Sequence, residues 1–475
     1  MIGDVVDIWV CRHHLGPLLE GGACDERVAV FLQTRHQFAA KLDRRSTVRR
    51  ASLHAAERRG NPERVFKRQS HESSLIVNWF GRMSYKPGRH FLQIPGPTNV
   101  PDRILHAIAN PTIDHRSADF AALTIECLEG MKAVFQTSGD VVIFPGSGTG
   151  AWEASLVNTL SAGDRVLAFD SGHFAGQWVK VAKNFGLNVD LIGGDWRCGA
   201  DAEALAARLN EDGSHEIRAV MVVHNETSTG VTSDIAAVRR ALDATGHPAL
   251  LMVDTVSSLG SIDYRHDEWC VDVAVAGSQK GLMLPPGLCF NAISEKAIAA
   301  GRRATLPRSY WRWDEMMEFN RKGFFPYTPA TNLLYGLREA VKMLVEEEGL
   351  PNVFRRHRRH AEATRRAVRA WGLAVFAINP AEFSPSATAI VMPEGFSETD
   401  LRAVILRHFN MSLGAGLGKL AGKVFRIGHL GSFNDLMLAG TLCGVEMGLK
   451  LAGVPHEPGG VAAALAWLTA EWLTT

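Results

Sequence analysis

Long apolar runs and an excess of charge of either sign are both missing from this chain of 475 residues. No run approaches the roughly 18 apolar residues of a membrane-spanning helix, and the C-terminus is not an S-K-L peroxisomal signal, so we expect a cytoplasmic protein without membrane contact. The 51 basic and 50 acidic residues leave a net charge of +1, which gives no field to attract nucleic acid. Small-molecule chemistry is the function class that this composition favours.

Closely paired cysteines are missing as well. The seven cysteines include no C-x-x-C pair and lie at positions 11, 24, 127, 198, 270, 289 and 443. This spacing argues against a zinc site, a redox motif or a small disulfide framework, and it fits reduced thiols. We therefore expect no metal site.

The first 82 residues differ in composition from the rest of the chain. They contain 14 Lys and Arg against 9 Asp and Glu, with little sustained apolar periodicity. Acidic residues near the start argue against a transit peptide. We expect residues 1–82 to be an N-terminal extension that is disordered or not part of the native fold, with Met83 as a plausible true start.

From about residue 84, apolar strand candidates alternate with helical stretches. The strands are expected at 141–144, 165–169, 219–223, 249–253 and 271–276, and the helices at 151–160, 174–185, 201–209 and 234–243. This alternation is typical of an α/β domain with a largely parallel sheet. After Pro329, long helical tracts and two further strands predict a smaller α+β domain. We expect a large domain over 83–340, including an N-terminal arm at 83–105, and a small domain over 341–475.

A lysine follows one of the predicted buried strands. Gly277-Ser278-Gln279-Lys280 ends the apolar run 271–276 and places Lys280 at the tip of that strand. Desolvation there disfavours the ammonium form, and a neutral amine can form a Schiff base with a carbonyl cofactor. Taken alone, however, the tetrapeptide is more typical of an ordinary lysine that reaches solvent.

A glycine-rich turn lies between a predicted strand and a predicted helix. Pro145-Gly146-Ser147-Gly148-Thr149-Gly150 aims backbone N–H groups and the positive end of a helix dipole at an anion. The turn is neither a Walker loop nor a dinucleotide fingerprint, so a phosphate monoester fits it better than a pyrophosphate. An ordinary tight turn has the same pattern.

Polar residues end two more strands at the same predicted sheet edge. Asp254 follows 249–253, where a carboxylate can keep a pyridinium nitrogen protonated, although a helix N-cap looks the same in isolation. The segment 224–230 either contacts the ring substituents of a cofactor or forms a capped turn. A strand-end aspartate followed 26 residues later by strand-end Lys280 is more specific than either residue alone.

From about 84 to 455 the chain resembles the class V, fold-type-I aminotransferases that use pyridoxal 5′-phosphate (PLP). Within them it is most similar to the serine–glyoxylate and alanine–glyoxylate group, with serine–glyoxylate aminotransferases the closest. The segments that carry the resemblance are PGPTNVP at 95–101, PGSGTGAWE at 145–153, VHNETSTGV at 223–231, VDTVSSLG at 253–260, GSQKGLMLPPG at 277–287, YTPATNLLYGLREA at 327–340 and KVFRIGHLG at 423–431. The implied fold is a mostly parallel seven-stranded sheet with a smaller C-terminal α+β domain.

The resemblance implies a role in binding the cofactor ring for four residues. Lys280 would hold PLP as a Schiff base and then move the proton between the substrate α-carbon and the cofactor. Asp254 would pair with the pyridine nitrogen, and Thr227 would lie near the ring hydroxyl. Phe174 would stack on the ring, at a position where relatives often have tryptophan.

The resemblance also implies how the phosphate is bound. Ser147, Gly148, Thr149 and Gln279 would hold it from one subunit of a homodimer. Thr328 would be contributed across the interface by the other subunit.

The implied reaction moves an amino group from serine to glyoxylate by a ping-pong mechanism and gives hydroxypyruvate and glycine. Arg426 would grip the substrate carboxylate, because a guanidinium binds a carboxylate through two parallel hydrogen bonds; without the resemblance, a surface salt bridge is the simpler reading. Aspartate or alanine as the amino donor is left open. Cysteine desulfurase and a non-catalytic protein that keeps the fold are weaker alternatives, since the first requires a mobile loop cysteine.

Overall fold

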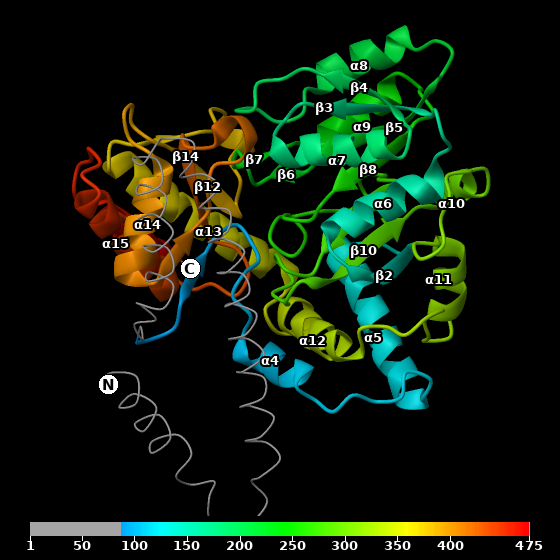
Figure 1. Cartoon of the computed structure of the whole chain (residues 1–475), viewed down its shortest axis with the longest axis horizontal. Coiled ribbons are helices and arrows are strands. Elements are labelled where there is room, and N and C mark those ends of the chain that lie inside the picture. Colours follow the sequence, from blue (N-terminus) through cyan, green and yellow to red (C-terminus); the bar gives the residue numbers. More distant parts are fainter. Residues whose placement is uncertain (1–86, 475) are drawn as a thin grey trace, which may run out of the picture. The chain divides into compact units, whose positions relative to one another are not determined.

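The structure is a computed structural model that describes residues 87–474. The predicted extension at 1–82 and the proposed start at Met83 lie outside the described residues. Gly88–Thr475 forms one compact unit, which contains every element discussed below (Figure 1). None of the described helices is long and apolar enough to cross a membrane.

A seven-stranded sheet forms the centre of this unit. The strands occur in the order β2-β10-β9-β8-β5-β3-β4, and only β10 runs antiparallel to its neighbours. Their bounds are β2 (Asp140–Gly146), β3 (Arg165–Phe169), β4 (Asn188–Ile192), β5 (Ile217–Val223), β8 (Leu250–Asp254), β9 (Val273–Gly277) and β10 (Gly287–Ile293). The expected mostly parallel seven-stranded sheet is confirmed.

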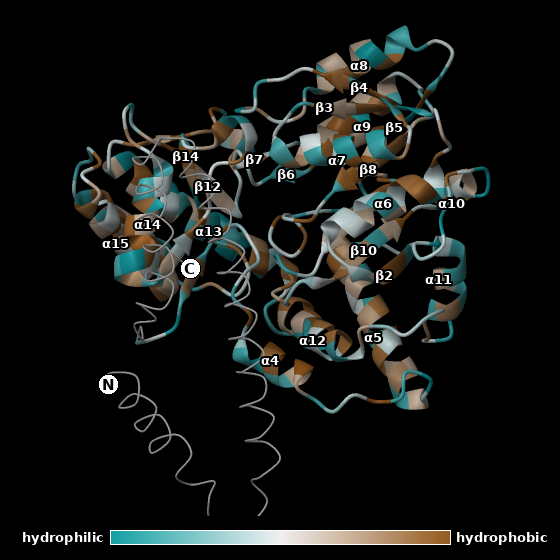
Figure 2. Ribbon diagram, in the orientation of Figure 1, coloured by the Kyte–Doolittle hydropathy of each residue, from teal (hydrophilic) through white to brown (hydrophobic). Residues whose placement is uncertain are grey.

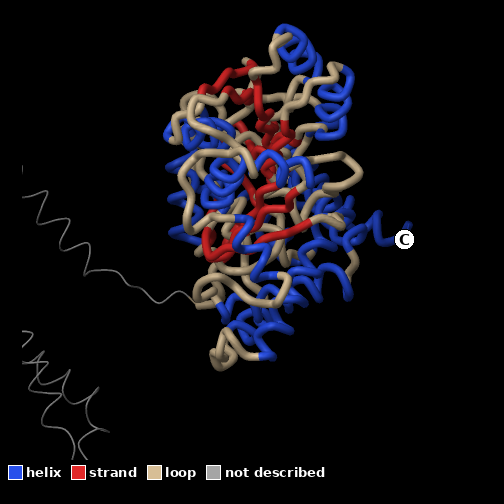
Figure 3. The backbone as a smooth tube through the Cα atoms, turned by 90° about the vertical axis from the view of Figure 1, so that its right-hand side faces the viewer, coloured by secondary structure: helices blue, strands red, loops and turns tan. Residues whose placement is uncertain are grey.

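Helices cover both faces of the sheet (Figure 3). They are α5 (Ala118–Phe135), α6 (Gly148–Thr159), α7 (His173–Asn184), α8 (Ala202–Glu211), α9 (Ile235–Ala244), α10 (Glu295–Gly301), α11 (Trp313–Asn320) and α12 (Thr331–Val341). All five residues of β8 and of β9 are buried, which explains why these strands are continuous apolar runs and not alternating ones. Figure 2 shows this hydrophobic interior between the more polar outer helix surfaces.

The C-terminal part has a buried cluster of its own. β11 (Ala374–Val375), β12 (Ala387–Val391) and β14 (Val424–Gly428) form an antiparallel sheet with α13 (Leu350–Ala370), α14 (Glu398–Phe409), α15 (Asp435–Leu451) and α16 (Gly460–Thr474) around it. β1 (Phe91–Gln93), from the predicted N-terminal arm, pairs in parallel with β13 (Met411–Leu413). The arm is thus tied to the C-terminal part of the chain.

Three neighbouring parallel strands end at the same edge and so position the functional residues. In register, Val223 of β5 lies beside Asp254 of β8, and Asp254 lies beside Val275 of β9. The segments that follow these strands therefore meet at the carboxyl edge of the sheet, where open α/β sheets bind ligands.

Candidate active site

A cavity of about 270 Å³ lies at this carboxyl edge. Eight of the ten residues predicted to form the site line it, namely Ser147, Gly148, Thr149, Phe174, Thr227, Asp254, Gln279 and Lys280. They come from five separate segments of the chain. The structure therefore brings together the residues that the sequence predicts, apart from Arg426 and Thr328.

Lys280 points its amine into a confined space. Its Nζ donates a hydrogen bond to the carbonyl oxygen of Pro95, and the Thr98 hydroxyl donates to the Lys280 carbonyl oxygen over 3.0 Å. Gly96 lies against the lysine at a φ of +97°, and a Cβ atom there would fall 2.3 Å from Lys280 Cδ. Only glycine tolerates both this backbone conformation and this approach.

The electrostatic surroundings favour a neutral Lys280 amine. Burial and the nearby positive charge of Arg426 lower its pKa to about 8, while Asp254 and Glu226 act in the opposite direction. About one tenth of the amine is therefore unprotonated at pH 7, far more than for an ordinary lysine. An amine in this state is nucleophilic and can also accept a proton.

Asp254 is a buried carboxylate with an unusually high proton affinity. Its Oδ1 accepts a hydrogen bond from the Val256 backbone N–H at 2.7 Å, and its Oδ2 accepts one from Trp152 Nε1 at 3.1 Å. Burial raises the pKa of Asp254 to about 7, and the negative charge of Glu226 contributes to the rise. A cation placed beside Asp254 would lower its pKa and restore the ionised carboxylate. The site is therefore suited to a positively charged ring nitrogen.

The glycine-rich turn begins α6 and leaves donor groups available. Ser147 is the N-cap residue, but its side chain makes no capping hydrogen bond. Backbone N–H groups in the first turn of a helix have no carbonyl partner within it, and they favour an anion. Gly148 packs so tightly on Val256 that a Cβ atom would fall 2.6 Å from a Val256 methyl group.

Gln279 completes the same corner of the cavity. Its buried Oε1 has no hydrogen-bond partner among the described residues. A Cβ atom on Gly277 would lie 3.0 Å from that oxygen and 3.3 Å from the Gly148 backbone nitrogen, so the Gln279 amide and the start of α6 are close together. A buried polar atom without a partner is costly, which indicates that a ligand supplies one here.

Glu226 is the important residue that sequence reasoning missed. This buried carboxylate accepts hydrogen bonds from the backbone N–H groups of Phe174 (3.0 Å) and Ala175 (3.1 Å) through Oε2. Through Oε1 it accepts from the backbone N–H of Ser228 (3.0 Å) and the Ser228 hydroxyl (2.6 Å). Glu226 thus fixes the start of α7, and with it the Phe174 ring, relative to Thr227.

Arg426 lies beside the cavity but does not line it. Its Nε donates to the Ala415 carbonyl oxygen at 2.8 Å, and its Nη1 donates to the Thr227 carbonyl oxygen at 2.9 Å. The side chain is buried and donates to carbonyl oxygens, with no ion pair to any described residue, so the reading as a surface salt bridge is wrong. Burial lowers the pKa of Arg426 to about 10, with Glu226 opposing.

Thr328 is exposed and lies outside the cavity of its own chain, in the segment before α12. Other lining residues that the sequence did not single out are Trp152, which holds Asp254, and Asn225. The Asn225 amide donates to the hydroxyls of Ser257 (2.8 Å) and Ser386 (2.9 Å), which ties the sheet edge to the C-terminal part. Trp152 belongs to the PGSGTGAWE segment, where it lies on the helix that follows the glycine-rich turn. This position could have indicated that Trp152 lines the site.

Comparisons with known proteins show which family this chain belongs to. The family model described as aminotransferase class-V matches residues 90–419. A serine–glyoxylate aminotransferase of Methylorubrum extorquens is 51% identical over 390 residues, covering 81% of this chain and 97% of the relative. An L-aspartate–glyoxylate aminotransferase of Paracoccus denitrificans is 48% identical over 373 residues. That match covers 78% of this chain and 94% of the relative.

Among solved structures, the pyridoxamine–pyruvate aminotransferase of Mesorhizobium loti superimposes with a TM-score of 0.76 at 28% identity. The match covers 82% of this chain and 99% of that one. The family match at 90–419 therefore spans the whole central sheet and every residue that lines the cavity. This chain belongs to the class-V aminotransferase family.

Proposed function

We propose that this protein is a PLP-dependent aminotransferase that moves the amino group of serine to glyoxylate, giving hydroxypyruvate and glycine. The observation that carries the proposal is the meeting of Lys280, Asp254 and the Ser147–Thr149 turn around one cavity. The 51% identity to a serine–glyoxylate aminotransferase supports the choice of substrates.

The residues around the cavity fit PLP. The turn at the start of α6 offers N–H donors for a phosphate, and the partnerless Gln279 amide can turn its nitrogen toward the same group. Asp254 suits a protonated ring nitrogen, and Lys280 suits an aldehyde carbon. The volume of about 270 Å³ is near the lower end of the range for small-molecule sites, roughly 300–1,000 Å³.

When bound, PLP would supply an electron sink for the negative charge that develops on the substrate α-carbon. The protein would supply the proton transfer, because a Lys280 amine with a pKa of about 8 can take a proton at Nζ and return it near neutral pH. Asp254 would contribute the negative charge that pairs with the protonated ring nitrogen. Phe174 would exclude water from one face of the cavity.

Arg426 would bind and orient the substrate. Its Nε and Nη1 are held by the carbonyl oxygens of Ala415 and Thr227, which fixes the guanidinium plane. A carboxylate bound to the remaining N–H donors would be held in one orientation, so the α C–H bond would face a fixed direction. The Thr227 contact connects the substrate-binding arginine directly to the wall of the cofactor cavity.

The donor assignment is tested by kcat/KM for serine, aspartate and alanine, each with glyoxylate as acceptor. Serine is expected to give the highest value. A more than tenfold preference for aspartate or alanine would overturn the choice of donor while leaving the aminotransferase assignment intact. Absence of transfer from every donor would overturn both.

Aspartate is the second candidate donor because a relative named for that activity is 48% identical over 373 residues. A cysteine desulfurase is disfavoured by the position of Cys289. This thiol is buried in β10, and burial raises its pKa, so it is neither mobile nor readily ionised.

We further propose a cytoplasmic homodimer in which Thr328 of one subunit contacts the phosphate bound by the other. The support is that Thr328 is exposed and does not line the cavity of its own chain, although its segment matches the family. The proposed domains are a PLP-binding domain over 83–340 and a small domain over 341–475.

Mixing two inactive variants tests the shared site. Lys280→Ala and Thr328→Glu are each expected to abolish transfer, the latter through repulsion of the phosphate. If Thr328 acts across the interface, subunit exchange creates dimers with one intact site, and activity returns in the mixture. A mixture that stays inactive after verified exchange would show that Thr328 acts in its own chain or not at all.

A further inference from the structure

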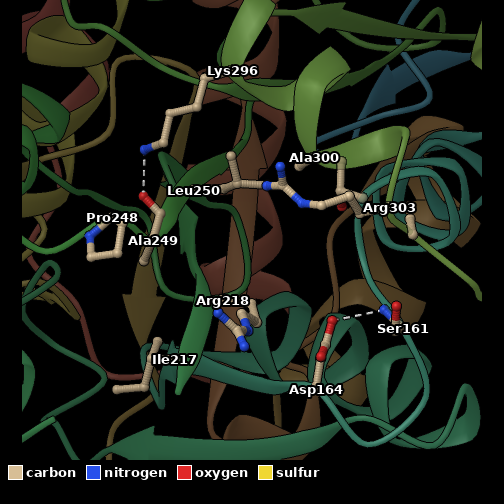
Figure 4. A pocket seen from close by; sticks show the side chains of 12 residues that line it. Ser161, Asp164, Ile217, Arg218, Pro248, Ala249, Leu250, Lys296, Ala300 and Arg303 are labelled. Carbon is tan, nitrogen blue, oxygen red and sulfur yellow. Dashed lines mark hydrogen bonds between the residues drawn. The ribbon is translucent and has the colours of Figure 1, made fainter. Parts of the chain in front are cut away.

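A second cavity, of about 340 Å³, lies at the opposite, amino edge of the central sheet (Figure 4). Its walls come from the end of α6, the loop before β3, the starts of β5 and β8, and α10 with the turn after it. It shares no lining residue with the candidate active site. The two cavities are therefore separate features of the same sheet.

Three cationic side chains surround this amino-edge cavity. Arg218 comes from β5, Lys296 from α10, and Arg303 from the turn after α10. Figure 4 shows the Arg303 guanidinium reaching across the cavity toward Leu250, with Lys296 on one side and Arg218 on the other. Three separate elements thus direct positive charge toward a common space, in a protein whose net charge is only +1.

The two arginines have side-chain N–H donors available for a ligand. The Arg303 side chain makes no hydrogen bond or ion pair with the residues that the structure describes, and the only side-chain bond of Arg218 is a long one, 3.4 Å to the His215 carbonyl oxygen. Positively charged side chains outnumber the one carboxylate, Asp164, among the described residues that line the cavity, so an anion between them would be favoured electrostatically.

Lys296 and Asp164 are held in place by the protein. Lys296 Nζ donates to the Ala249 carbonyl oxygen at 2.7 Å and lies 3.3 Å from the Asp272 carboxylate. Asp164, the single acidic residue in the lining, accepts the Ser161 backbone N–H at 2.7 Å. The four charged residues leave the cavity with a net charge of +2.

A substrate in the active site cannot reach this cavity. β8 runs from Leu250, which lines the amino-edge cavity, to Asp254, which lines the active site. Four residues of strand correspond to about 13 Å. Any ligand of the amino-edge cavity is therefore an additional molecule.

We propose that the amino-edge cavity binds a small metabolite that carries a phosphate dianion. The planar donor fork of a guanidinium matches phosphate oxygens through paired hydrogen bonds, and two such forks with a lysine would neutralise a dianion. The exposed Pro248 and the partly exposed Ala300 and Ala304 provide an apolar surface for the remainder of the metabolite. This proposal does not depend on the identity of the amino donor.

Calorimetric titration of the PLP-saturated protein with inorganic phosphate and with glycerol 2-phosphate tests the site. Saturation with PLP keeps the probes away from the phosphate turn of the active site. Both probes are expected to bind the wild-type protein, and Arg303→Gln and Arg218→Gln are each expected to weaken binding about tenfold. Both side chains are exposed, so the variants should fold normally.

Arg302→Gln is the matched control, because Arg302 is exposed and adjacent to Arg303 but does not line the cavity. It is expected to bind the probes as the wild type does. The proposal would be overturned by an absence of binding up to about 10 mM, by unchanged affinity in Arg303→Gln, or by an equal loss in Arg302→Gln. Binding of succinate but not phosphate, or a change in the absorbance of the bound cofactor, would equally contradict it.

Discussion

Two buried aspartates at opposite edges of the central sheet have opposite pKa shifts. Asp212, just before β5 at the amino edge, accepts hydrogen bonds from the backbone N–H groups of Glu216 (3.1 Å) and Ile217 (2.7 Å) and lies 3.1 Å from His247 Nε2. Burial opposes ionisation of Asp212, but these bonds outweigh it and lower its pKa to about 2. At the carboxyl edge, burial raises the pKa of Asp254 to about 7.

The difference teaches that burial alone does not determine the charge of a carboxyl group. Asp212 has four donors to stabilise its anion, the fourth being the Ser214 hydroxyl at 3.5 Å, while Asp254 has two and also has the Glu226 charge nearby. A fully compensated carboxylate strengthens the fold. An incompletely compensated one can exchange a proton or pair with an added cation, which is what a cofactor site requires.

The largest effect is expected from Lys280→Ala. Without the amine, the protein has no group at this position to bond the cofactor or to move the α-proton, so serine–glyoxylate transfer should fall by at least roughly 10²–10⁴-fold. Steady-state kinetics at saturating PLP measures this loss. Lys183→Ala, at an exposed lysine of α7, is the matched control and should retain full activity.

Asp254→Asn should have the next largest effect. The amide keeps the shape of the side chain but cannot become an anion, so the ring nitrogen loses its counter-charge, and kcat should fall by roughly 10²-fold. The PLP affinity of the apoprotein, measured by fluorescence, should also weaken. Activity within twofold of the wild type would remove Asp254 from the proposed role.

Glu226→Gln should have an intermediate effect and sharpen the comparison of buried carboxylates. The Glu226 carboxylate accepts hydrogen bonds from two pairs of donors, one at the start of α7 and one on Ser228. A glutamine has only one side-chain oxygen, so its NH₂ group would face one of these pairs and those hydrogen bonds would be lost. Loss of the Glu226 charge should also lower the pKa of Lys280 below about 8, because that charge raises it.

The rate of PLP association with the apoprotein reports the Lys280 amine directly, since only the neutral amine reacts. In the wild type this rate should increase with pH through about 8 and then level off. In Glu226→Gln the same rise should occur at lower pH, together with an approximately tenfold lower PLP affinity. Coincident pH profiles would leave Glu226 as a structural residue only.

Asp212→Asn should have the smallest functional effect, with a change in stability but not in kcat/KM. Removing one acceptor from a buried network should cost about 1–3 kcal/mol of unfolding free energy at neutral pH. Because the folded pKa of Asp212 is depressed, its contribution is present above about pH 4 and is lost as the pH falls toward 2. Urea unfolding at pH 7 and pH 3 measures the difference between wild type and variant, which should be smaller at pH 3.

The sequence predicts most of the sheet because buried parallel strands are continuous apolar runs. The sequence does not predict β4 and β10, because neither is a continuous apolar run, and the reason differs between the two strands. β4 lies at the edge of the sheet and buries only Ile192 fully, so its apolar content is low. In β10 the run is interrupted by Asn291, whose buried amide donates to the carbonyl oxygens of Ala151 and Ala274.

The candidate site is predictable where a residue follows a strand or opens a helix. Asp254, Lys280 and the Ser147–Thr149 turn are of this kind, and family motifs extend the set. Glu226 could not be found in this way, because the partners that connect it to α7 are backbone N–H groups about fifty residues earlier in the chain. The position of Arg426 beside Thr227 likewise depends on tertiary contacts that no local pattern encodes.

The most direct test of the account is to identify the residue that bonds the cofactor. PLP-loaded protein reduced with sodium borohydride, digested and analysed by mass spectrometry should carry the pyridoxyl group on Lys280, in the Gly277–Gly287 segment. Addition of serine before the reduction should abolish this labelling, because the amino donor displaces the lysine. Labelling of another lysine, or no labelling of protein shown to be saturated with PLP, would contradict the central claim.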